Sequence, residues 1–382
     1  MEAVRRFLAC RTLVRMALVL VLGMASPSSA DVPSDVAGTS DPPRVGSAVT
    51  PPFPCSVGTR SFTTTAPQMV LTMPTVIVSK SVTVTGMGPF LWDLDLETWI
   101  RHPKVGELTI TLESPGGVTI TIARERGGVT ADAYHGTVWD DQAGEPVSDH
   151  TFGTGLAAHL SPEQAVARLR GTNPNGVWTI YVSDPVANDT YGVFESATLR
   201  VTALPLAPAW TVTTVTDTPP TPIAIPNGPA GAAVTRTLSV ANPGGAPIGD
   251  VVLTTDIPHE WSGDLDITLT SPRGTVALIT NGNPRGASAM FDNVYAGTIW
   301  SVLGPPVTLE AMVDGTAELM LGAEEPLSVF AGEDPQGLWT LSITDRYNHP
   351  GFFNDATVFV MPPQVGAWPC PPGKYAVLFQ HL

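Results

Sequence analysis

The feature that most constrains the fold of this chain is an internal repeat. The nine residues from Glu107 to Pro115 reappear, with the same pattern, from Asp264 to Pro272, 157 positions later. Two further blocks, 134–139 and 171–184, recur 161 positions later, so four extra residues separate the blocks of the second copy. Matching order and spacing over more than a hundred positions predict two copies of one folding unit.

Each copy has the pattern of antiparallel strands. Apolar and polar residues alternate over 108–112 and again over 118–122, and the turn Ser114-Pro115-Gly116-Gly117 separates them. This pattern predicts a hairpin with one buried face. The run from Pro162 to Leu169 is the only helix-like segment of the first copy. Several short strands with little helix predict an all-β fold of two tandem antiparallel β-sandwiches.

Composition sets the domain boundaries. Residues 1–30 carry four Arg before and within an apolar run and then small residues, which predicts a signal peptide cleaved near Ala30. Pro-rich, Ser-rich and Thr-rich stretches predict linkers at 31–65 and 205–219. We therefore expect domains at 66–204 and 220–361 and a tail at 362–382.

The charge of the chain excludes one class of function. The formal net charge is -16 over 382 residues, and removal of residues 1–30 takes away four Arg and one Glu and leaves -19. Such an acidic protein lacks the basic surface that displaces counterions from nucleic acid, so we expect no nucleic-acid partner. No later apolar run is long enough to span a bilayer, so we expect a secreted protein, periplasmic or extracellular, without membrane insertion after signal cleavage.

Two cysteines remain after signal cleavage. Cys55 and Cys370 bracket nearly all of the exported chain, and an oxidising compartment favours a disulfide between them. Free or intermolecular thiols are the alternative, because the sequence does not give the distance between the two residues.

The repeated framework resembles the P/Homo B domain, the P-domain of proprotein convertases. The resemblance rests on the motifs shared by both copies, which in the first are Ile100-x-His102, Glu107-Leu108, Ser114-Pro115-x-Gly117, Gly136-Thr137-x-Trp139, Gly171-x-x-Pro174-x-Gly176-x-Trp178 and Asp184. It implies jelly-roll-like sandwiches and a role beside a serine-type endopeptidase, in proteolysis. The subtilisin-like catalytic domain that precedes this module in the family has no counterpart in the printed sequence.

Two fragments are similar to catalytic motifs of subtilisin-like enzymes. His135-Gly136-Thr137 matches the motif around the catalytic His, but the second copy has Ala296 where the first has His135. Gly155 stands where Gly153-Thr154 would lead to a catalytic Ser. Since a triad needs Ser, His and Asp held together, we predict no catalytic residues and no autonomous proteolysis.

Calcium is the small ligand that the sequence favours. Asp140, Asp141 and Asp184 offer the carboxylate oxygens that calcium prefers, and the second copy has Ser301-Val302 in place of the first two. We therefore expect calcium, if bound, in the first domain. The alternative is that these carboxylates are solvated or form turns.

Other repeated residues are interpreted as framework. His102 and His259 each precede an acid by five positions, and a hydrogen-bonded structural His is favoured over a metal or proton-sensing site. Aromatic residues beside strands are favoured as core residues over carbohydrate platforms: Trp139, Trp178, Trp300 and Trp339.

Three functions are compatible with these features. The favoured one is a secreted, non-catalytic tandem module that binds or stabilises a secreted serine protease or a cell-surface ligand. The alternatives are an accessory chain or fragment of a subtilisin-like endopeptidase, active only with a separate catalytic domain, and a surface or matrix adhesion protein.

Overall fold

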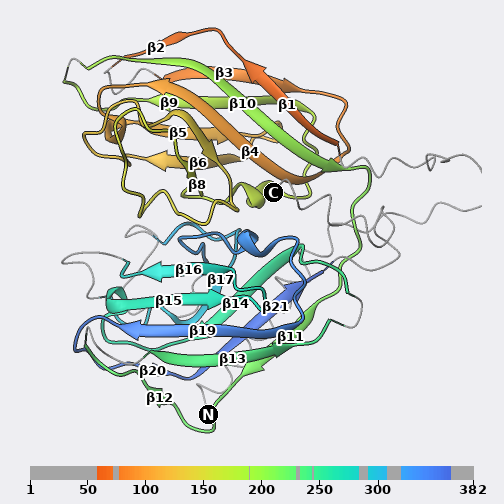
Figure 1. Cartoon of the computed structure of the whole chain (residues 1–382), viewed down its shortest axis with the longest axis vertical. Coiled ribbons are helices and arrows are strands. Elements are labelled where there is room, and N and C mark those ends of the chain that lie inside the picture. Colours follow the sequence, from red (N-terminus) through yellow and green to blue (C-terminus); the bar gives the residue numbers. More distant parts are fainter. Residues whose placement is uncertain are drawn as a thin grey trace, which may run out of the picture. The chain divides into compact units, whose positions relative to one another are not determined.

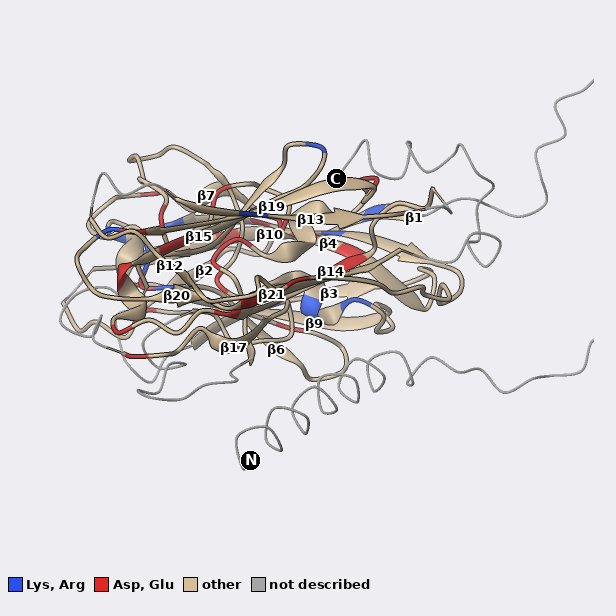
Figure 2. Ribbon diagram, turned by 90° about the horizontal axis from the view of Figure 1, so that it is seen from below, with Lys and Arg blue, Asp and Glu red and all other residues tan. Residues whose placement is uncertain are grey.

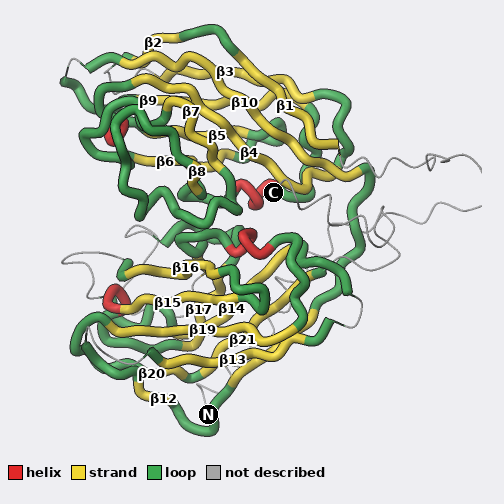
Figure 3. Tube along the Cα trace, viewed as in Figure 1, coloured by secondary structure: helices red, strands yellow, loops and turns green. Residues whose placement is uncertain are grey.

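The computed structural model describes residues 58–71, 77–188, 190–228, 233–242, 245–283, 291–307 and 320–362. The chain divides into two units after Ser56, and every described residue lies in the unit Val57–Leu382. Within this unit the chain is all β, as predicted, and its described helices are single 3-10 turns (Figure 3).

The first copy is a sandwich of two sheets that are antiparallel except for the short parallel pair β7–β8 (Figure 1). One sheet has the order β1-β10-β4-β7-β8, with β2 also paired to β10, and the other has the order β3-β9-β5-β6. The bounds are β1 Gly58–Thr64, β2 Gln68–Val70, β3 Ile77–Val84, β4 Phe90–Arg101, β5 Thr109–Glu113, β6 Thr119–Arg124, β7 His135–Trp139, β8 His159–Leu160, β9 Gly176–Ser183 and β10 Gly192–Leu204.

The second copy repeats the order of the two main sheets, with eleven described strands where the first copy has ten. Its sheets have the orders β11-β21-β14-β17-β18 and β13-β19-β15-β16, and β12 pairs with β20. The bounds are β11 Thr213–Asp217, β12 Ile223–Ala224, β13 Val234–Val240, β14 Asp250–Asp256, β15 Leu265–Thr270, β16 Val276–Asn281, β17 Ala296–Trp300, β18 Met320–Leu321, β19 Gly337–Asp345, β20 Phe352–Phe353 and β21 Asp355–Met361.

The predicted hairpins are β5–β6 and β15–β16. Leu108, Ile110 and Leu112 are fully buried, so the apolar face of the alternation points into the sandwich. Both hairpins also share a register shift, between Ile110 and Thr111 and between Ile267 and Thr268. The same sequence pattern therefore produces the same irregularity twice.

The helix-like run 162–169 contains only the 3-10 turn η2, Val166–Leu169. The other described turns are η1 Val105–Glu107, η3 Ser262–Asp264 and η6 Leu327–Phe330. Turns η1 and η3 follow β4 and β14, and they carry Glu107 and Asp264. Equivalent turns thus place equivalent acids at the ends of the two sandwiches.

Two strands lie in segments whose composition predicted linkers. Strand β1 pairs with β10 over seven residues, and β11 pairs with β21 over five. Each of these strands lies at the edge of its sheet, where one side faces water. An edge strand can therefore contain many Thr and Ser residues. An edge strand rich in Thr and Ser and a polar linker have similar compositions. Composition alone therefore predicted linkers where the structure has the strands β1 and β11.

Each sandwich has its own apolar core. The first is formed by both sheets around Trp139 and Trp178, and the second around Trp300 and Trp339. All four of these side chains are fully buried.

An inward-facing cation marks one edge strand of each sandwich. Lys80 is in the buried row of β3, where its Nζ donates to the Ala66 carbonyl and lies 5.0 Å from the centre of the Phe194 ring. Arg236 holds the matching position in β13, forms two hydrogen bonds with Asp217 and lies 5.7 Å from the centre of the Phe353 ring. Each cation therefore has oxygen acceptors and an aromatic face.

Candidate functional site

The candidate site of the first sandwich is centred on His102, the residue after β4. Its side chain and that of Asp184, which follows β9, have no exposed surface, and Nε2 lies 3.1 Å from Asp184 Oδ2. The other ring nitrogen, Nδ1, lies 2.8 Å from the carbonyl oxygen of Lys104 and 3.2 Å from its backbone nitrogen. Two strands distant in sequence thus bring an imidazole and a carboxylate together in the interior.

A glycine makes room for the His102 ring. A Cβ at Gly192 would lie 2.6 Å from His102 Cδ2, closer than real Cβ atoms approach. Gly351 has the same relation to the ring of His259 in the second sandwich. Both copies therefore require glycine beside the buried imidazole.

Glu107 completes the cluster from η1. Its Oε1 accepts from Asn188 Nδ2 at 2.6 Å and from Lys104 Nζ at 3.2 Å, and its Oε2 accepts from Thr190 Oγ1 at 3.0 Å. Partial burial acts to raise the pKa of Glu107, but these hydrogen bonds outweigh it and the pKa is lowered. The carboxylate is therefore held in its charged form.

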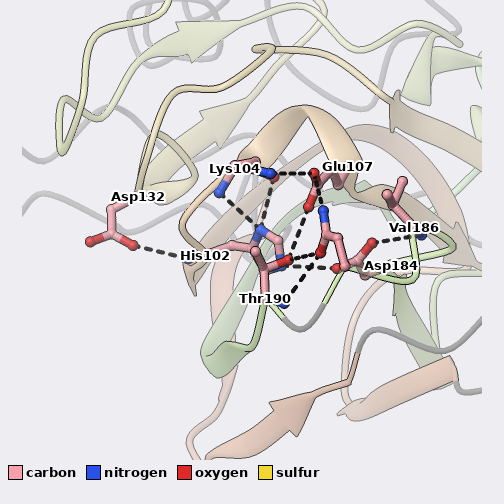
Figure 4. Close-up of polar contacts among 8 residues, drawn as sticks. His102, Lys104, Glu107, Asp132, Asp184, Val186 and Thr190 are labelled. Carbon is pink, nitrogen blue, oxygen red and sulfur yellow. Dashed lines mark hydrogen bonds and ion pairs between the residues drawn. The ribbon is translucent and has the colours of Figure 1, made fainter.

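Figure 4 shows Glu107, Asp184 and Thr190 gathered on one side of His102, with Asp132 on the other, where it accepts from the His102 backbone N–H. One ligand atom from each of His102, Glu107 and Asp184 lies within 4.8 Å of the other two. Within the described ranges this is the one group of three or more His, Cys, Asp or Glu that meets this criterion.

The second sandwich builds a related but different cluster. His259 Nε2 lies 3.5 Å from Asp345 Oδ2, and both side chains are fully buried. Its Nδ1 accepts from the Trp261 backbone N–H at 3.1 Å. Here His349 stacks on Trp261 at 4.0 Å, and its Nδ1 lies 2.6 Å from Asp264 Oδ2.

The residues predicted for calcium occupy two places. Asp184 belongs to the His102 cluster, whereas Asp141 accepts from the Val166 and Ala167 N–H groups, at 2.9 and 2.8 Å, and from Ser328 Oγ at 2.9 Å. Asp140 accepts from the Gln142 N–H at 2.7 Å and lies 2.8 Å from His159 Nε2. Calcium binding by these carboxylates stays a prediction.

Further acids lie near Asp140 and Asp141. Asp93 and Asp95, on β4, face outward from their sheet, and burial together with neighbouring carboxylates raises their pKa values to about 7 and about 9. Burial also raises the pKa of Asp141 to about 6, against hydrogen bonds that lower it. Figure 2 shows acidic residues on the strands and loops of both sandwiches.

The His-Gly-Thr fragment is part of the repeated framework. His135 begins β7 and lies 3.1 Å from Glu195, and Thr137 Oγ1 donates to the Ala133 carbonyl. The equivalent Thr298 donates in the same way to the Val294 carbonyl. Among the described residues every imidazole lies within 4.0 Å of a carboxylate oxygen: those of His102, His135, His150, His159, His259 and His349.

Each of the four repeated tryptophans donates its indole N–H inside the core. Trp139 and Trp300 donate to Thr98 and Thr255, both at 2.9 Å. Trp178 and Trp339 donate to the carbonyls of Pro174 and Pro335, at 2.8 and 3.0 Å.

Several predicted features lie outside the described residues. These are the signal peptide 1–30, Cys55, Cys370 and most of the tail 362–382. Among the residues described, no helix is long and apolar enough to cross a membrane.

Sequence reasoning did not identify Lys104, Asn188, Thr190 or His349 as parts of these clusters. For Lys104, Asn188 and Thr190, the sequence offered only their proximity along the chain to Glu107 and Asp184. At the repeat shift of 161 positions His349 corresponds to Asn188, and because the two residue types differ, the repeat gave no reason to select either.

Comparison with known proteins identifies the repeated unit. The proprotein convertase P-domain matches residues 91–201 and 248–357, which together are more than half of the chain. No curated protein matches the sequence.

Solved structures show only distant similarity. The serine protease of Aeromonas sobria is 16% identical over 42% of this chain and 28% of that chain, with a TM-score of 0.27. The same protease in complex with the chaperone ORF2 is 14% identical over 67% of this chain and 36% of that chain, with a TM-score of 0.28. This chain therefore spans well under two thirds of the length of either protein chain.

Proposed function

The chain belongs to the proprotein convertase P-domain family, in two tandem copies, and we propose that it is an exported accessory module that binds and stabilises the catalytic domain of a serine endopeptidase. The observation that carries this proposal is the double family match, with the framework of strands, turns and buried tryptophans repeated in both copies. The predicted signal peptide supports export.

A binding role rather than a catalytic one is supported by the state of the histidines. A general base for a serine nucleophile must reach its hydroxyl, at about 2.6–3.2 Å. In the part of the chain that the structure describes, each imidazole lies beside a carboxylate that could orient it, but no hydrogen bond joins an imidazole to a serine hydroxyl. The catalytic serine is therefore expected on the partner.

The experiment measures the protease rather than the module. A purified subtilisin-like catalytic domain is heated with and without equimolar full-length chain, and its remaining peptidase activity is followed over time. We expect the chain to lengthen the half-life of inactivation, because a ligand that binds only the native state stabilises it by mass action. An equal mass of serum albumin is the control for nonspecific protection.

A fluorophosphonate probe separates this proposal from the enzymatic alternative. Labelling of the catalytic domain alone, with a longer half-life in the mixture, supports the accessory role. Labelling of this chain by itself would show an activated serine and overturn the proposal, as would an unchanged half-life together with no complex in gel filtration.

A further inference from the structure

In both His–Asp pairs of the molecule, Nδ1 faces the backbone N–H two residues further on, at 3.2 Å in His102 and 3.1 Å in His259, and the pairs differ in a second contact at Nδ1. The shorter contact of His102 Nδ1, 2.8 Å, is to the Lys104 carbonyl oxygen, which only accepts. A proton on Nδ1 satisfies this contact. The Nε2 atom then presents a lone pair to Asp184 Oδ2 at 3.1 Å.

A lone pair that faces a carboxylate in the interior is repulsive unless a proton or a metal cation lies between them. Both side chains are fully buried, so water does not screen the contact. The other oxygen of Asp184, Oδ1, already accepts from the Val186 N–H at 3.0 Å. Oδ2 is thus the atom that meets Nε2, and the pair is arranged to receive a positive charge.

Glu107 supplies a second carboxylate, with an oxygen within 4.8 Å of a ring nitrogen of His102 and of a carboxylate oxygen of Asp184. Asn188 and Thr190 hold it through its two oxygens, as outer-sphere donors hold a metal ligand, and the Lys104 ammonium pairs with its Oε1. Its side chain is 14% exposed, whereas the other two ligands are fully buried, so Glu107 marks the side from which an ion would enter.

We propose that His102, Glu107 and Asp184 form a binding site for a divalent transition-metal ion, with zinc as the best-fitting example. Bonds of about 2.0–2.2 Å to one imidazole nitrogen and two carboxylate oxygens suit zinc, and ligand atoms around it are then about 3–4 Å apart. Calcium prefers six or more oxygen ligands, so the imidazole disfavours it. The two carboxylates balance the charge of the ion.

The second sandwich lacks this arrangement and serves as an internal control. His259 Nδ1 accepts from the Trp261 N–H, as His102 Nδ1 does from the Lys104 N–H, but among the described residues no carbonyl oxygen faces His259 Nδ1, so its proton is on Nε2 and faces Asp345. Asp264, the counterpart of Glu107, is engaged by His349 at 2.6 Å. We therefore assign the site to the first sandwich alone.

The ion would connect three segments at one end of the first sandwich. These are the end of β4, the turn η1 and the end of β9. Binding should therefore raise the melting temperature of the protein, and the rise should grow with the logarithm of the ion concentration above the dissociation constant.

The test is calorimetric titration of zinc chloride into the full chain after its thiols are alkylated. We expect one ion per chain, an affinity at least tenfold weaker for Glu107→Gln, and an unchanged affinity for Asp264→Asn. Glu107→Gln keeps the shape of the side chain and removes its charge. Circular dichroism of the metal-free proteins shows whether each variant folds.

A measurement on the unmodified sequence keeps the test decisive if a variant fails to fold. X-ray absorption at the zinc edge should show nitrogen and oxygen ligands with no sulfur. The proposal is overturned by the absence of binding, by equal affinities of wild type and Glu107→Gln, by loss of binding in Asp264→Asn, or by calcium displacing zinc at equal concentration.

Discussion

At the scale of single residues, the repeated tryptophans show what a sequence can and cannot reveal. Their size and their place beside strands predicted burial. The acceptors of their indole N–H groups were not predictable, because Thr98 is 41 positions from Trp139 and faces it only once β4 and β7 pair. A partner across strands is a property of the register.

Substitution of Thr98 by Val should destabilise the first sandwich by about 1–3 kcal/mol, because it leaves the buried Trp139 N–H without its acceptor while conserving volume. The measurement is the midpoint of urea unfolding, followed by tryptophan fluorescence.

Thr63→Val is the matched control. Thr63 forms a hydroxyl pair with Thr198 on the exposed face of β1, so its loss should change the free energy of unfolding by about 0.5 kcal/mol or less. Equal effects of the two substitutions would contradict the role given to the buried hydrogen bond.

At the scale of elements, strands with strong alternation were predictable and short ones were not. The hairpin β5–β6 follows from its pattern, whereas β8 has only two residues and pairs in parallel with β7. A two-residue strand leaves no periodic signal, so only its partner defines it. The His102 site was not predictable from a local pattern either, because 82 positions separate its His and Asp and only the folded strands bring them together.

The turn before the late strand of each copy requires glycine. Gly176 has a φ of +135°, and a Cβ there would lie 2.7 Å from Pro115 Cβ. Gly337 repeats this contact with Pro272 at 2.8 Å. The Pro-x-Gly turn thus fits against the Ser-Pro turn of the hairpin.

Gly176→Ala should cost about 2–4 kcal/mol, because backbone strain and a close contact act together. Gly117→Ala, at a φ of +78° with no atom within 4 Å of the added Cβ, should cost about 1–2 kcal/mol from strain alone. Melting curves of both variants show which one loses more stability. A larger loss of stability for Gly117→Ala would contradict the destabilising role given to the close contact at Gly176.

At the scale of the whole molecule, buried carboxylates should set how stability depends on pH. Burial, with help from Asp140, raises the pKa of Asp93 to about 7, and burial raises that of Asp141 to about 6. Carboxyls in the unfolded chain titrate near 4, so the folded state binds more protons than the unfolded state between about pH 4 and pH 7. Stability should therefore fall as the pH rises through this window.

Asp93→Asn should reduce this slope by up to about 1.4 kcal/mol per pH unit and make the protein more stable than wild type at pH 8. The measurement is chemical unfolding at several pH values between 4 and 8. Parallel curves for variant and wild type would refute the assignment.

Asp334→Asn gives the control of opposite sign. Slight burial acts to raise the pKa of Asp334, but hydrogen bonds from Gln336 and Asn242 and the charge of Arg273 lower it. Its carboxylate thus favours folding above about pH 4, and its loss should lower stability at pH 7, by less than about 1 kcal/mol because the group is half exposed.

The inward-facing cations on β3 and β13 bear on how these molecules behave when they are concentrated. An edge strand offers unpaired backbone groups to any other strand, which is the first step toward aggregation. A strand from another molecule could pair with β3 and extend the sheet. Its inward-facing side chains would then lie beside the ammonium group of Lys80, which disfavours apolar packing there. Arg236 would have the same effect at β13. One inward-facing charge on each of these two edge strands therefore works against fibril-like growth at that edge.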